Sequence, residues 1–242
     1  MSGTKQELMS TLQDIRHAHD VRLRAANARK PESVVLEGLP DLRSGRVHEV
    51  EGPLRSSFAL SILRHTRTWA LWVSDVSVEV LRQRALDGMP DGSRFGCIRT
   101  GSRDETLWAA EQALRCPGMD AVVFDIQRGP DLFESRRLQV AAQAGGGIGL
   151  ALIARQCQSS ACDTRWFCSR SDDPDHDWQW ALTKARRSPP QAWRIQSRPS
   201  PAHSHPADLL PSPLPHLHDT PTFQTTPLAS LPTASAGPVG AP

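Results

Sequence analysis

Short apolar runs alternate with amphipathic stretches between residues 46 and 155 of this 242-residue chain. Runs such as AVVF and IGLALI are apolar throughout, which is typical of strands covered on both faces of a parallel sheet. The stretches between them have apolar residues at helical spacing, so the alternation predicts an α/β fold whose parallel strands are joined by crossover helices. Strands are predicted at residues 47–51, 69–73, 95–99, 121–126 and 148–153, and helices at residues 56–65, 76–85, 104–116 and 131–144.

The pattern is different at the two ends of the chain. Residues 4–30 have helical spacing that Pro31 ends, which predicts an N-terminal helix within residues 1–30. Residues 164–169, 178–183 and 191–195 contain Trp and Thr and predict antiparallel strands at one edge of the sheet, which completes a core domain over residues 31–196. Residues 197–242 contain 11 prolines and few charges, so we expect a disordered tail.

The turn after the first predicted strand is similar to a phosphate-binding loop that has lost its chemistry. Gly52 and Pro53 follow the strand, and an apolar helical stretch comes next. A working loop ends in Gly-Lys-Ser/Thr, where the Lys reaches the phosphates and the hydroxyl binds magnesium. Ser57, Phe58 and Ala59 stand at these three positions. We therefore expect a bulky ring in the phosphate site, no nucleotide hydrolysis and no cofactor.

Two carboxylates follow predicted strands at positions that matter in ATPases. Asp125 ends the fourth strand, where a magnesium-positioning acid would lie, and Asp75 follows the second strand, where a carboxylate often orients water. Capping of the next helix is the favoured role for Asp75. The alternative is a true ATPase with an unusual site around Gly52, Asp75 and Asp125.

Composition adds limited information about partners. The net charge of +2 and the pI of 8.4 are too mild to indicate a nucleic-acid partner by themselves. The five cysteines form no CxxC pair, which favours reduced thiols without a metal, and no apolar stretch suits a signal peptide or a membrane span, so we expect a cytoplasmic protein. Eight basic residues are candidates for contact with a partner or a DNA backbone, and the alternative is that they are ordinary solvated side chains. They are Arg16, Arg22, Arg24, Arg136, Arg137, Lys184, Arg186 and Arg187.

Several segments taken together resemble the ImuA family, the RecA-like components of bacterial damage-induced mutagenesis cassettes. The matching segments are GRVHEVEGP, RDETLWAAEQALRCPGMDAVVFD, SRRLQVAAQAGGGIGLAL, TRWFCSR and QAWRI, within residues 31–195.

The resemblance implies a RecA-like fold and a non-catalytic adaptor in the SOS response and translesion synthesis. The partners that it implies are an ImuB-like, Y-family-like protein, an error-prone replicative-type DNA polymerase and RecA. Residues 127–130 leave no room for the longer DNA-binding loop of a recombinase at this place, so strand exchange is not expected. The alternative within the same fold is a division inhibitor similar to SulA.

Overall fold

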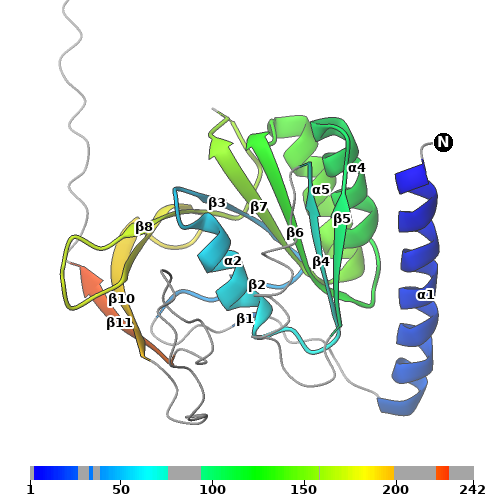
Figure 1. Cartoon of the computed structure of the whole chain (residues 1–242), viewed down its shortest axis with the longest axis horizontal. Helices are drawn as coiled ribbons and strands as arrows, with labels where there is room; N and C mark the ends of the chain where they lie inside the picture. Colours follow the sequence, from blue (N-terminus) through cyan, green and yellow to red (C-terminus); the bar gives the residue numbers. More distant parts are fainter. Residues whose placement is uncertain are drawn as a thin grey trace, which may run out of the picture.

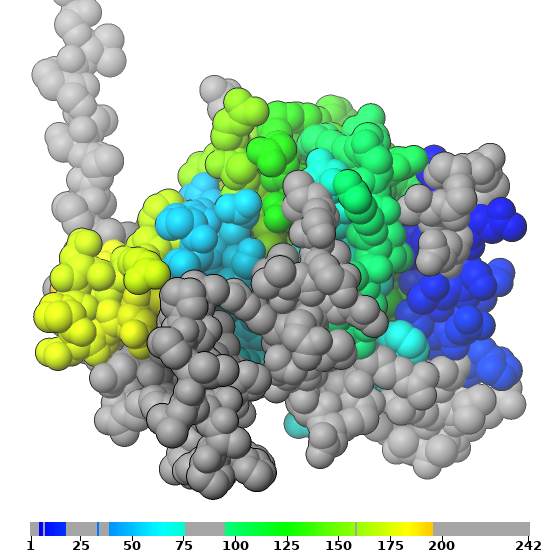
Figure 2. All heavy atoms as spheres, viewed as in Figure 1, coloured from blue at the N-terminus to red at the C-terminus, as the bar shows by residue number. Residues whose placement is uncertain are grey.

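The structure, a computed structural model, describes residues 3–26, 33–34, 39–75, 94–157, 159–198 and 222–228. Within these residues a nine-stranded mixed sheet has the order β11-β10-β9-β8-β3-β7-β6-β4-β5 and carries helices on both faces (Figure 1). Helix α1 lies at one end of the molecule, and residues around β9 form the opposite end (Figure 2). The helix predicted at residues 76–85 lies outside the described residues. None of the helices in the described ranges is long and apolar enough to cross a membrane.

The parallel part of the sheet confirms the α/β fold class. Each of the five predicted strands is present and is parallel to its neighbours in the sheet. Three of the predicted helices also form, and they connect these strands as crossovers. The strands are β3 (Val47–Glu51), β4 (Trp69–Ser74), β5 (Arg94–Arg99), β6 (Met119–Arg128) and β7 (Ile148–Arg155), and the helices are α2 (Arg55–Leu63), α4 (Arg103–Leu114) and α5 (Leu132–Gly145).

The antiparallel edge begins one strand later than the sequence predicted. Strand β8 (Thr164–Arg170) is parallel to β3 on one side and antiparallel to β9 (Trp178–Ala185) on the other. Strand β10 (Gln191–Arg198) then pairs antiparallel with β9. The strand direction therefore changes between β8 and β9, because the chain crosses over between β7 and β8 but turns back directly after β8.

Part of the proline-rich tail forms a strand, where disorder was expected. Residues Thr222–Leu228 form β11, which pairs antiparallel with β10 and covers that edge of the sheet. The segment TFQTT has residues that favour strands, and an edge position tolerates Pro227 because one side of the strand needs no ladder hydrogen bonds. A separate two-stranded ribbon joins β1 (Ser33–Val34) to β2 (Leu42–Arg43).

Helices cover the two faces of the sheet with separate apolar clusters. On one face, α2 packs on a cluster that contains Trp72, Trp166 and Trp180. On the other face, α4 and α5 pack on the parallel strands, and α1 (Gly3–Ala26) contacts α4 and β5. The side chains of Leu8 and Leu12 in α1 are at most 2% exposed, so α1 is an amphipathic helix that packs on the domain.

Helices α4 and α5 begin with side-chain caps that their sequences encode. The Ser102 side chain accepts a hydrogen bond from the backbone amide of Glu105 at the start of α4. Asp131 and Glu134 form a reciprocal capping box at the start of α5. Gly146 ends α5 in a left-handed conformation with φ of 75°. The glycine-rich stretch after α5 therefore terminates a helix.

A buried ion pair connects β3 to β8 beneath the helices. The Nε and Nη2 atoms of Arg165 each lie 2.7 Å from Oε2 of Glu49, whose side chain is fully buried. Arg165 also donates to Gln156 Oε1 at 2.8 Å, and Gln156 donates to Glu51 Oε1 at 2.6 Å. The positive charge of Arg165 is thus balanced by the carboxylate of Glu49 in a region with little access to water.

Replacing Glu49 by Gln is expected to lower the free energy of unfolding by about 3 kcal/mol, because the Arg165 charge would stay buried without its anion. The double substitution Glu49→Leu with Arg165→Met should recover most of this loss. Urea unfolding, followed by tryptophan fluorescence, measures the free energy of unfolding of the single and the double variant. The pair of Arg115 with Glu111 serves as the control. Arg115 is 40% exposed, and Glu111 keeps a second partner in Arg137, so Arg115→Ala should cost about 1 kcal/mol or less. If the Glu49→Gln variant and the double variant lose the same free energy of unfolding, the buried charge of Arg165 is not the cause of the loss.

Candidate functional site

The turn between β3 and α2 is short and packed against β8. Three residues, Gly52, Pro53 and Leu54, separate the strand from the helix. Gly52 has φ of 94°, and a Cβ atom at this position would lie 2.3 Å from the backbone oxygen of Cys168. The amide of Leu54 donates to that same oxygen at 3.1 Å. This amide is therefore used by the neighbouring strand and is not free to bind a phosphate.

The two side chains at the Lys and Thr positions of the loop lie in the apolar core. Phe58 and Ala59 are both 0% exposed, and Ser57 is half-buried. The ring centroid of Phe58 is 5.3 Å from that of Trp166 and 4.9 Å from that of Trp180. The expected position of the ring in the phosphate site is thus corrected: α2 begins at Arg55, so Phe58 already faces the sheet from within the helix.

The cation near the acidic strand end comes from the first residue of α2. Nη2 of Arg55 lies 3.8 Å from Oδ1 of Asp125, and their side chains are 27% and 15% exposed. Burial raises the pKa of Asp125, Arg55 partly opposes this rise, and the charge of Asp75 adds to it. The Asp125 carboxylate therefore faces a cation of its own chain where an ATPase would place magnesium.

Asp75 lies beside this pair at the carboxyl edge of the sheet. It follows β4 directly, and the preceding residue, Ser74, is in register with Asp125 of β6. The helix that Asp75 was predicted to cap lies outside the described residues. Across the described ranges, no group of three or more His, Cys, Asp or Glu side chains is placed to hold a metal ion.

The basic residues singled out in the sequence lie on three different elements. Arg16 is exposed on α1, and the side chains of Arg22 and Arg24 lie outside the described ones. Arg136 and Arg137 are exposed on α5, and Arg137 forms an ion pair with Glu111 of α4. The remaining three lie at the end of β9 and in the turn that follows, namely Lys184, Arg186 and Arg187.

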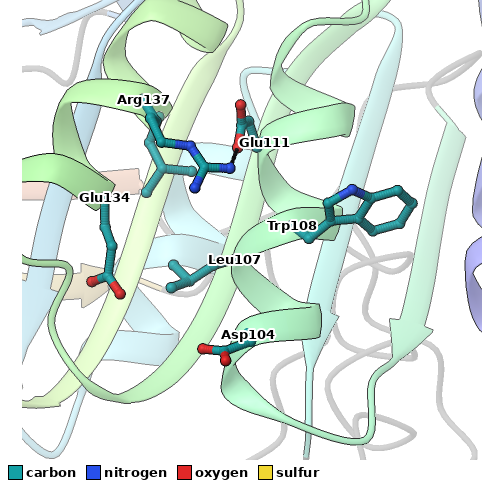
Figure 3. Close-up of a pocket in the computed structure, with 7 residues that line it drawn as sticks. Asp104, Leu107, Trp108, Glu111, Glu134 and Arg137 are labelled. Carbon is teal, nitrogen blue, oxygen red and sulfur yellow. Dashed lines mark hydrogen bonds and ion pairs between the residues drawn. The ribbon is translucent and has the colours of Figure 1, made fainter.

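An open groove of about 380 Å³ runs between α4 and α5 (Figure 3). Figure 3 shows Arg137 directed across the groove toward Glu111, with Leu107 and Trp108 on the α4 side. The ammonium of Lys5 in α1 lies 5.2 Å from the centre of the Trp108 ring. The groove therefore lies between two helices, contacts α1 through Trp108, and combines apolar with charged side chains.

The outer surface of α5 beside this groove exposes two large apolar side chains. Phe133 is 76% exposed and Val140 is 55% exposed. They are seven residues apart, so they lie on one side of the helix with Arg136 and Arg137 between them. We call these four residues the α5 face. Its arginines were predicted from the sequence as candidate contacts, but Phe133 and Val140 were not. The signal in the sequence is an apolar residue at each end of the charged side of α5.

The similarity to known proteins is partial. The chain is similar to Protein ImuA of Caulobacter vibrioides, in strain NA1000 / CB15N and in strain ATCC 19089 / CIP 103742 / CB 15, with 29% identity over 143 residues in both cases. The match spans 51% of this chain and 58% of each relative, and no protein-family model matches the chain. Both relatives carry the ImuA name, which supports the resemblance weakly and leaves the division-inhibitor alternative without support.

Replacing Phe58 by Lys is expected to lower the free energy of unfolding by about 3 kcal/mol or more, because the ammonium would be buried between α2 and two tryptophans. Phe58→Leu, which keeps an apolar side chain, should cost less. Chemical denaturation of the three proteins provides the comparison. If the Lys variant were as stable as the original chain, the position would be open to solvent and the observed packing would be wrong.

Replacing Arg55 by Gln is expected to raise the pKa of Asp125 further, since the nearby cation opposes the effect of burial. Because the folded-state pKa is above the unfolded value, the contribution of Asp125 to stability is complete at low pH and is lost as pH rises through the folded pKa. In the Arg55 variant this loss should extend to higher pH.

Unfolding free energies measured between about pH 4 and pH 7 would reveal the shift in that pH-dependent loss. Adding Asp125→Asn to the Arg55 variant should abolish it. If the shift persists in the double variant, another group causes it.

Proposed function

We propose that this chain is a non-catalytic RecA-like adaptor in damage-induced mutagenesis, where it serves the SOS response and translesion DNA synthesis through protein–protein contacts. The observation that carries the non-catalytic part is the complete burial of Phe58 and Ala59. Transfer of a phosphoryl group requires a cation and a magnesium ligand at these two positions. The role in mutagenesis is supported by the family resemblance of the motifs and by the partial match to ImuA.

The charges at the carboxyl edge of the sheet also favour a site that has lost its nucleotide. Arg55 faces Asp125 from within the chain, so the carboxylate needs no bound metal for partial compensation. The short turn at Gly52 uses the Leu54 amide for contact with β8. A recombinase couples its interfaces to nucleotide binding. In this chain contacts within the protein itself, between Arg55 and Asp125 and between the Leu54 amide and Cys168, hold the corresponding region, so the contacts of the adaptor are constitutive.

The α5 face is the surface that we propose for docking of a protein partner. Protein interfaces combine apolar or aromatic anchors with arginines, and such residues carry much of the binding energy. Phe133 and Val140 provide exposed anchors, and Arg136 lies between them. The candidate partners are the ImuB-like protein, the error-prone replicative-type polymerase and RecA. The first experiment is therefore pairwise binding of the purified chain to each of these three.

The double substitution Phe133→Ser with Val140→Ser is expected to reduce damage-induced mutation frequency to the level of cells that lack the gene. Stability should remain within about 0.5 kcal/mol, since both side chains are mostly exposed. Phe167→Ser provides a matched control, because Phe167 is 41% exposed on β8, away from α5, and its loss should leave mutagenesis unchanged.

Asp125→Asn should also leave damage-induced mutagenesis nearly unchanged if no magnesium is held. Two results would contradict the proposal. The first is normal mutagenesis in the variant that lacks both anchors, and the second is nucleoside triphosphate hydrolysis by the purified chain that Asp125→Asn abolishes.

A further inference from the structure

A second groove lies at the amino ends of the parallel strands, whereas the turn at Gly52 lies at their carboxyl ends. It has a volume of about 450 Å³ and lies between β2 and the turn from β9 to β10. Its floor includes Thr164 at the start of β8 and Leu182 of β9. Neither the degenerate nucleotide site nor the α5 face contributes a residue to this groove, so it is a separate feature of the molecule.

Three arginines from two distant parts of the sequence line this groove. Arg43 comes from β2, and Arg186 and Arg187 come from the turn after β9. Within the described residues none of the three forms an ion pair. Arg186 instead donates to the neutral backbone oxygen of Ala161 at 3.2 Å, which holds its guanidinium in place without cancelling its charge. The lining also contains Asp41 and Asp163, of which Asp163 is 8% exposed.

Nearby cations increase the positive charge of the groove. Lys184 precedes a lining residue, and its ammonium donates to the backbone oxygen of Ser160 at 2.7 Å, which again leaves its charge uncompensated. Arg46 is close enough to His48 to lower the pKa of that imidazole. Among the lining residues themselves, three arginines face two carboxylates, so this region attracts anions.

A buried histidine fixes one wall of the groove. His48 is 0% exposed; its Nδ1 lies 2.8 Å from Oγ1 of Thr164, and its Nε2 lies 3.2 Å from the backbone oxygen of Arg43. Burial lowers the pKa of His48 to about 4, so the ring is neutral at physiological pH, and its Nε2 donates to the Arg43 carbonyl. The imidazole therefore holds the backbone of Arg43 against β8 before any ligand binds.

We propose that this groove binds the phosphodiester backbone of single-stranded nucleic acid. Arginine forks match phosphate oxygens in a bidentate manner, and a cradle with several cations suits a polymer with one charge in each repeat. The volume is in the range of small-ligand pockets, about 300 to 1,000 Å³, and admits a short piece of one strand and no duplex.

The lining favours a nucleic acid over an acidic protein segment. Protein interfaces need large apolar anchors at their centre, whereas the largest apolar side chain in this groove, Leu182, is fully buried. The exposed large apolar side chains of the described residues lie elsewhere, on α5 and β8. None of the described residues that line the groove is aromatic, so they give bases no stacking platform, and binding is independent of sequence. This inference does not rest on the adaptor function.

The test is fluorescence anisotropy of the full chain with a labelled oligodeoxythymidylate of about 20 nucleotides, titrated at several salt concentrations from about 50 mM. Three phosphate contacts predict a slope of log Kd against log salt of about 2. The triple substitution Arg43→Ala, Arg186→Ala and Arg187→Ala should weaken binding at least about tenfold at low salt and flatten the slope. An oligouridylate of equal length shows whether the groove favours DNA or RNA.

The matched control replaces three exposed arginines at the carboxyl ends of β5, β7 and β8, namely Arg99, Arg155 and Arg170, by Ala. It changes the net charge by the same amount and should bind the oligonucleotide as the original chain does. Four results would overturn the proposal: no binding at low salt, unchanged binding by the groove variant, an equal loss in the control, or equal competition by poly-glutamate. The last result would identify the groove as a site for acidic protein segments.

Discussion

The contact of Phe58 with Trp166 and Trp180 is the interaction on which the rest of the structure depends. Its three rings belong to α2, β8 and β9, so the contact joins the first crossover helix to the place where the sheet changes from parallel to antiparallel. Burial of large aromatic surface is among the strongest contributions that single side chains make to a core. The position that the sequence pattern matches to the lysine of a phosphate-binding loop is part of this core, so a charge there would cost stability.

The same packing is the reason why we propose other surfaces for recognition. Gly52 approaches the β8 backbone closely, and Arg55 faces Asp125, so the carboxyl edge of the sheet satisfies its own hydrogen bonds and charges in large part. Two other surfaces of the described residues carry the proposed recognition sites. The α5 face exposes apolar anchors beside two arginines, and the groove at the amino edge gathers cations. The two surfaces differ in polarity, which suits them to different kinds of partner.

Local sequence patterns predicted much of the fold because each acts over a few residues. The strand at Val47–Glu51 was placed at its observed bounds, since a short β-prone run followed by Gly52 defines both of its ends. Asp131 and Glu134 encode the start of α5 through a capping box. The prediction that β8 is antiparallel was wrong for its pairing with β3. This pairing joins residues more than 110 positions apart and leaves no local signal in the sequence. The edge strand β11 was missed because it lies in a segment whose proline content predicts disorder.

The sequence by itself determined which chemistry is absent from the loop, since Phe58 and Ala59 cannot replace an ammonium and a hydroxyl wherever they lie. It also determined the alternation of strands and helices, because the period of apolar residues follows from backbone geometry. Only the tertiary structure decided that the ring lies in the core, that Arg55 faces Asp125, and that Arg43 joins Arg186 and Arg187 in one groove. Such contacts between residues that are distant in the sequence depend on the order and direction of the strands, which the packing of the whole chain selects.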